Sequence, residues 1–230
     1  MGRALAAASR FFRSRRTNNA IAHTASRGCK ASSGRIPEED ADRFLFGSLL
    51  PDAGERVSAH FRIPVDGGKR ITMSLGNFRD RFSDQMEDSL YLGYNLHLVQ
   101  DIVFRKLFYL DRGWQPDSPE KIARLYNDYR ILNAWAIEKY GLQENIAVPR
   151  GYDGEPIHAV SAFMLPQFLF ELHKDFVTPP PDGECVYYTK DIAEEFLTES
   201  VKLCRLETEA LREGKSVVDE YAWAWYADKK

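Results

Sequence analysis

Residues 89–110 read SLYLGYNLHLVQDIVFRKLFYL, and this stretch decides the fold class. Six of its apolar residues are spaced by four, three, four, four and three positions: Leu92, Leu96, Val99, Val103, Leu107 and Leu110. This spacing is the period of an α-helix with one apolar face, whereas a strand would alternate apolar and polar residues. We therefore predict a long helix over residues 89–110.

Helical signals continue along the rest of the chain. The pair Ser118-Pro119 is a typical helix start, with Ser118 as the cap, and Gly141 should end that helix. Further helices are predicted in residues 37–47, 75–86, 157–176 and 191–213. The third of these should be kinked at Pro166. The sequence shows no internal repeat and no βαβ unit, so the predicted fold is an all-α, multi-helix single domain.

Two segments between these helices are predicted as loops. The chain should leave helical structure at residues 50–52 and continue as a loop to Pro64, with a turn at residues 66–68, which read DGG. Residues 143–156 are polar and interrupted by glycine and proline, so they should also form a loop.

The composition is that of an ordinary globular chain with unevenly distributed charge. Apolar residues make up 44% of it, and no apolar run approaches about 18 residues, so no membrane span is expected. Residues 1–37 hold seven Arg, one Lys and no acid, whereas the remainder holds 23 basic and 34 acidic side chains. Because phosphates require a basic face, we expect the folded body to bind no nucleic acid. Three widely separated cysteines, Cys29, Cys185 and Cys204, indicate reduced thiols.

The basic N-terminus allows three interpretations. An Arg-rich and Ser-rich segment without acids is typical of a transit peptide. The same composition suits a flexible arm that binds nucleic acid or a membrane surface. The segment could also extend upstream of the natural start. Because it lacks the long apolar core of a secretory signal, we expect a disordered extension in residues 1–16, a helical metal-binding domain in residues 17–230 and a cytoplasmic location.

His97 and Asp101 lie four residues apart on the predicted helix. That spacing places both side chains on one face, about 6 Å apart along the axis, where they can converge on one divalent ion. Imidazole nitrogen and carboxylate oxygen suit zinc or a similar first-row metal. A simple His–Asp ion pair uses the same spacing and is the alternative. Gly93, one turn earlier on this face, would let another segment approach closely.

Two further motifs precede this pair. Residues 46–52 read FGSLLPD, residues 59–62 read AHFR, and the helix itself carries LGYNLHLVQD at residues 92–101. This ordered trio resembles the zinc-dependent phospholipase C family, in particular its small bacterial members. The resemblance covers roughly residues 20–110.

The resemblance implies a phospholipase C/P1 nuclease-like helical fold and a zinc site. The four ligands it implies for this ion are Asp52, His60, His97 and Asp101. It also implies that His23, which precedes Gly47 by 24 residues, binds another metal ion. One or two zinc ions are therefore expected.

The sequence departs from the family pattern after Asp101. The next family ligand is a histidine about six residues further on, and Leu107 occupies that place here. A later H-x-x-x-E helix is also missing. Glu171 and His173 are weak substitutes because residues two apart point to different helix faces, and His158 is weaker still. A complete three-metal phospholipase site is therefore not expected.

With zinc bound, the function expected is that of a metal-dependent phosphoester hydrolase. Zinc makes water a usable nucleophile near neutral pH, and Asp52 or Asp101 could act as the general base while also binding the ion. Arg62 and Arg105 are candidates to hold phosphate oxygens of a small phosphoester or phospholipid-like substrate. Two alternatives stay open. Four protein ligands could close a purely structural zinc site, or the substrate could be a nucleotide.

Overall fold

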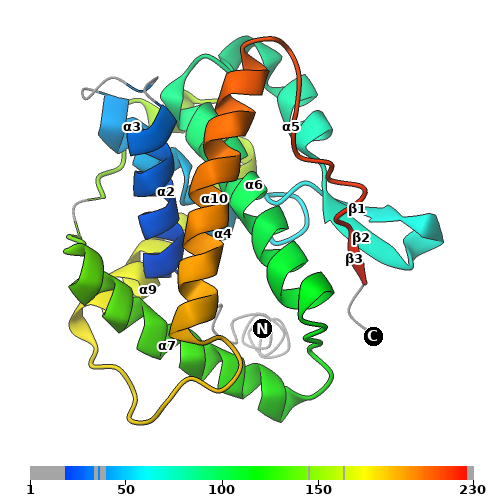
Figure 1. Ribbon diagram of the computed structural model, residues 1–230. Coiled ribbons are helices and arrows are strands. Elements are labelled where there is room, and N and C mark those ends of the chain that lie inside the picture. Colours follow the sequence, from blue (N-terminus) through cyan, green and yellow to red (C-terminus); the bar gives the residue numbers. More distant parts are fainter. Residues whose placement is uncertain (1–18, 34–35, 37–39, 145, 163, 227–230) are drawn as a thin grey trace, which may run out of the picture.

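The computed structural model describes residues 19–33, 36, 40–144, 146–162 and 164–226. Helices make up most of this part of the chain, and a small antiparallel sheet lies at one edge (Figure 1). The predicted helical class is thus confirmed, whereas the sheet was not predicted. The expected extension in residues 1–16 lies outside the described residues. Among the residues that the structure describes, no helix combines the length and apolar composition needed to cross a bilayer.

The helix predicted from residues 89–110 lies at the centre of the fold. It forms α6 (Ser89–Phe104) and continues as the π-helical segment η4 (Arg105–Asp111). The Asp88 carboxylate caps its first turn by accepting a hydrogen bond from the Leu90 N–H (2.8 Å). Every residue of α6 except Asp101 and Phe104 is buried, so other elements surround this helix instead of covering one apolar face.

Two long helices pack against α6, and a third crosses near their ends. α2 (Asn19–Ser33) and α10 (Lys190–Leu211) lie side by side against it, and α7 (Pro119–Tyr140) crosses near their ends (Figure 1). α7 has the predicted boundaries, because the Lys121 N–H donates to Ser118 Oγ (3.2 Å) and Gly141 takes a left-handed backbone, φ 56°. α10 also agrees with its prediction.

The shorter helices differ from the predictions in three places. The shorter helices are α3 (Ala41–Gly47), α4 (Leu50–Ala53), α5 (Leu75–Arg81), α8 (His158–Ser161) and α9 (Leu165–Val177), with 3₁₀ turns η2 (Asp66–Gly68), η3 (Ser83–Gln85) and η5 (Tyr152–Gly154). The loop predicted from residue 50 was wrong at its start, because α4 accommodates Pro51 in its first turn, where no backbone donor is needed. For the same reason Pro166 lies in the first turn of α9 and does not kink one long helix. The helix predicted over residues 75–86 ends earlier and is followed by η3.

The sheet contains three short strands in the order β1-β2-β3. β1 (Arg62–Val65) and β2 (Arg70–Met73) form a hairpin around the predicted turn, and β3 (Trp225–Tyr226) adds to β2. The loop predicted as far as Pro64 was therefore wrong for its last residues. Four-residue strands with a proline at the edge carry little alternation to reveal them. The sheet brings Trp225 and Tyr226 back beside residues 70–71 of β2.

Two glycines allow α3 and α6 to cross with their backbones in contact. A Cβ at Gly47 would lie 2.0 Å from the Leu90 carbonyl oxygen, and a Cβ at Gly93 would lie 2.2 Å from the Phe44 carbonyl oxygen. The close approach predicted at Gly93 is thus confirmed. The crossing places Ser48, just after α3, beside the middle of α6, where its carbonyl oxygen lies 2.7 Å from His97 Nδ1.

Candidate metal centre

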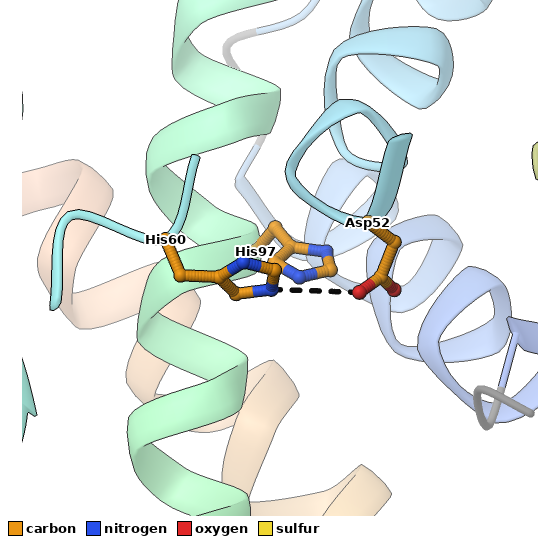
Figure 2. A group of neighbouring side chains, drawn as sticks. All are labelled: Asp52, His60 and His97. Atoms are coloured by element: carbon orange, nitrogen blue, oxygen red, sulfur yellow. Dashed lines mark ion pairs between the residues drawn. The ribbon is translucent and has the colours of Figure 1, made fainter. Parts of the chain in front are cut away.

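Three separate segments bring Asp52, His60 and His97 together. Asp52 lies on α4, His60 in the turn before β1 and His97 on α6, and Figure 2 shows their side chains converging on one space. One ligand atom from each residue lies within 4.8 Å of the other two. Both histidines are buried, and Asp52 is partly buried. These three residues could hold a metal ion.

Asp101 joins this group through His60. The Nε2 atom of His60 lies 3.4 Å from Asp52 Oδ1 and 3.6 Å from Asp101 Oδ2, so it stands between two carboxylates. The side chain of Asp101 is 29% exposed and that of Asp52 is 19% exposed. The structure therefore gathers all four residues of the implied zinc site, with Asp101 at its more open side.

His97 is oriented as a metal-binding histidine would be. Its Nδ1 atom lies 2.7 Å from the Ser48 carbonyl oxygen, which can only accept, so Nδ1 carries the proton and donates. The other ring nitrogen, Nε2, is buried with no hydrogen-bond partner among the described residues. A buried lone pair without a partner is unfavourable, and metal-binding histidines commonly donate their second nitrogen to a carbonyl. The residues present thus fit a divalent cation.

His60 is also suited to act as a ligand. Burial lowers its pKa, although the hydrogen bond to Asp52 and the negative charge of Asp101 oppose this effect. A neutral imidazole has a lone pair for a metal, whereas a protonated one has none. His60 is therefore in the protonation state that binding requires near neutral pH.

The backbone around His60 is fixed by neighbouring aromatic residues. Tyr94, one turn before His97, donates from its hydroxyl to the Ala59 carbonyl oxygen (2.5 Å). Phe61 adopts a left-handed backbone, φ 50°, which costs a non-glycine residue about 1 kcal/mol. Its ring packs edge-on against Phe78, with centroids 5.3 Å apart, and this packing compensates for the strain. Hence α6 carries two of the four candidate ligands, His97 and Asp101, and also holds the turn that carries a third, His60.

The structure does not bring His23 into this group. His23 lies on α2, fully buried, and neither ring nitrogen has a hydrogen-bond partner among the described residues. Burial, assisted by the positive charge of Arg27, lowers its pKa from 6.5 to about 4. A second metal ion at His23 stays a prediction.

The neutral state of His23 predicts acid sensitivity of the metal-free protein. The unfolded chain takes up a proton near pH 6.5, but the folded chain does so only near pH 4. The contribution of His23 to the free energy of unfolding is therefore fully present above pH 6.5. It falls by up to about 3 kcal/mol as the pH drops from 6.5 to 4. Urea unfolding of the chelated protein at several pH values measures this loss. His23→Leu should flatten that part of the profile, and an equal loss in the variant would contradict the assignment.

The weaker ligand candidates lie in other ion pairs. His173 Nδ1 lies 2.8 Å from a Glu144 oxygen at the surface, and His158 Nε2 lies 3.5 Å from an Asp153 oxygen. Glu171 accepts a hydrogen bond from Gln167 at the surface. Leu107 is buried in the core. The structure therefore adds none of these side chains to the metal centre.

The metal centre opens into a cavity of about 260 Å³. Arg62 and Arg105, both singled out from the sequence, line this cavity together with Arg56, which was not. The Arg105 guanidinium carbon lies 4.5 Å from the Tyr109 ring centre and 5.4 Å from that of Trp225. Trp225 also lies 5.8 Å from the Arg62 guanidinium carbon, so β3 holds a ring beside both arginines.

Sequence reasoning missed the aromatic part of the cavity wall. Tyr109, Trp114, Tyr126 and Tyr129 line it, and they come from η4, the following loop and α7. The structure adds one indication, because a π-helical segment such as η4 is frequent at functional sites. The four-three spacing of residues 89–110 predicted a continuous α-helix there and gave no sign of this segment.

No protein-family model, curated protein or solved structure matches the chain. The resemblance carried by residues 46–52, 59–62 and 92–101 therefore stays a prediction. A function can be inferred only from the chemistry that the site itself offers.

Proposed function

We propose that this protein is a metal-dependent phosphoester hydrolase with the phospholipase C/P1 nuclease-like fold that its motifs resemble. The observation that supports this proposal best is that two imidazoles, two carboxylates and three arginines border one cavity. Nitrogen and oxygen ligands suit zinc, and arginines suit a phosphoryl group. Few other reactions would require both.

In this proposal Asp52, His60, His97 and Asp101 hold a zinc ion. When bound, the ion would act as a Lewis acid that makes water nucleophilic near neutral pH and neutralises charge on the phosphoryl group. Arg62 and Arg105 bind phosphoryl oxygens and keep the ester oriented. Their contact with Trp225 limits the positions their guanidinium groups can take.

The chain also provides the proton acceptor for hydrolysis. Asp101 is the more exposed of the two carboxylates, so it accepts the proton from the attacking water. The water oxygen forms a bond to phosphorus as the bond from phosphorus to the ester oxygen breaks. The departing oxygen takes a proton from solvent and leaves as an alcohol, and Asp101 releases its proton to solvent. Asp52 remains the alternative base.

We expect the protein to contain close to one zinc ion per chain and to hydrolyse p-nitrophenyl phosphate or its diester. Asp101→Asn should reduce the hydrolysis rate at least about 100-fold, because it removes the proton acceptor and one of the four proposed zinc ligands. Elemental analysis and release of p-nitrophenol are the measurements. Asp153→Asn is the matched control, since that carboxylate is exposed and pairs with His158.

The outcomes separate this proposal from the structural alternative. Stoichiometric zinc without hydrolysis of either ester would favour a site closed by four protein ligands. Protein purified without chelators that contains no zinc or similar metal would contradict both functions.

A further inference from the structure

The cavity extends well beyond the metal centre along α6 and η4. His97, Asp101, Arg105 and Tyr109 line it in turn, each about one turn further along the chain. At the rise of a helix, His97 and Tyr109 lie roughly 17 Å apart along the axis. The cavity is therefore long enough to hold a group attached to a phosphoryl oxygen.

The part beyond Arg105 is apolar and largely aromatic. Its lining side chains come from η4, the next loop and α7: Tyr109, Trp114, Ile122, Leu125, Tyr126 and Tyr129. Flat side chains offer faces and edges against which another ring packs well. An aliphatic chain would gain no such preference from them.

A positive charge marks the boundary between the two parts. Arg105 follows Asp101 by one turn, and its guanidinium packs on the Tyr109 ring at 4.5 Å. An anion held near Arg105 would thus have the metal ligands on one side and aromatic rings on the other. Such a gradient fits a ligand with one anionic and one apolar end.

The aromatic part contains an unsatisfied hydrogen-bond donor. The Trp114 indole N–H is buried with no hydrogen-bond partner among the described residues, although the side chain lines the cavity. Tryptophan normally finds a partner for this donor when buried. An acceptor atom on the apolar end of a ligand could provide it.

We propose that the site binds a phosphate ester of a compact phenol, that is, an aryl phosphate. The phosphoryl group lies between the metal ligands and Arg105, and the ring lies among Tyr109, Trp114 and Tyr126. The proposal rests on the proposed function for the phosphoryl end. The cavity, at about 260 Å³, is smaller than the roughly 300–1,000 Å³ typical of sites for drug-sized ligands, so a two-chain phospholipid would not be enclosed.

The test measures binding instead of turnover. Phenylphosphonate and methylphosphonate share the anionic group and differ only in the ring, and neither is hydrolysed. With the zinc-loaded full chain, we expect phenylphosphonate to bind at least about tenfold more tightly in calorimetry. Tyr126→Ala and Ile122→Ala should each reduce this preference several-fold and leave the affinity for methylphosphonate unchanged.

Both substitutions lie on α7 at partly buried positions, so the variants should still fold. Tyr140→Ala is the matched control, because Tyr140 lies at the end of α7, is 39% exposed and does not line the cavity. It should keep the full preference for phenylphosphonate.

Four outcomes decide between the proposals. Equal affinities for the two phosphonates would overturn the ring subsite and leave the hydrolase proposal intact. Tighter binding of decylphosphonate than of phenylphosphonate would overturn it in favour of an alkyl chain. A ring preference that Tyr126→Ala does not weaken would place the ring elsewhere and overturn it too. If Tyr126→Ala loses the ring preference and the wild-type protein does not hydrolyse phenyl phosphate, the result would support this inference and contradict the proposed function.

Discussion

His97→Ala is expected to lose the bound metal ion while the chain stays folded. The substitution removes the Nε2 atom, which is buried among the other ligands and has no other described partner. Loss even of a residue that only orients a ligand commonly weakens metal binding 10–100-fold, so loss of the ligand itself should exceed about 100-fold. Competition with a chromophoric chelator measures the zinc affinity directly.

Two controls separate loss of the ligand from a general disturbance. His173→Ala removes a surface histidine that pairs with Glu144, and it should bind zinc as the wild type does. Chelation should lower the melting temperature of the wild type, because an ion bound by Asp52, His60 and His97 would link α4 and the His60 turn to α6. His97→Ala should show no such shift. A His97→Ala protein that retains stoichiometric zinc would exclude the site.

Local signals predicted α7 and α10 well, whereas α2 was not among the helices that they predicted. Ser118 and Gly141 define α7 because a cap and a left-handed glycine act within one turn of the chain. The burial of α6 follows from its apolar content. By contrast, β3 has two residues and forms only because residues 70–71 lie beside it, so no local pattern could reveal it.

The metal centre was only partly accessible from the sequence. The helical period placed His97 and Asp101 on one face, but nothing local connects them to Asp52 and His60. That connection came from the resemblance, and the structure reproduces the proximity through the crossing of α3 and α6 and the Tyr94 hydrogen bond to Ala59.

The cavity could not be predicted from the sequence. Its walls come from segments between Ala22 and Phe196, and their approach depends on the packing of the whole chain. The contact of Arg62 and Arg105 with Trp225 likewise depends on β3. The sequence analysis named the two arginines as candidates to hold phosphate oxygens, whereas only the tertiary structure shows that they share one cavity.

Gly93→Ala is expected to destabilise the protein and to weaken its metal site together. The new Cβ would lie 2.2 Å from the Phe44 carbonyl oxygen and 2.9 Å from the Ser48 nitrogen, both backbone atoms that no side-chain rotation can move. α3 must therefore shift, at a cost of about 3 kcal/mol in the free energy of unfolding. The shift would carry the Ser48 carbonyl away from His97 Nδ1, whose hydrogen bond orients the ring.

Urea unfolding of the chelated protein and zinc competition measure the two effects of Gly93→Ala separately. Gly76→Ala is the matched control, because Gly76 also lies in a helix but a Cβ there meets nothing closer than 3.9 Å. It should change stability by less than about 1 kcal/mol and leave zinc affinity intact. If Gly93→Ala lost stability but bound zinc normally, the Ser48 carbonyl would not be what orients His97. If it were as stable as Gly76→Ala, the close crossing of α3 and α6 would itself be wrong.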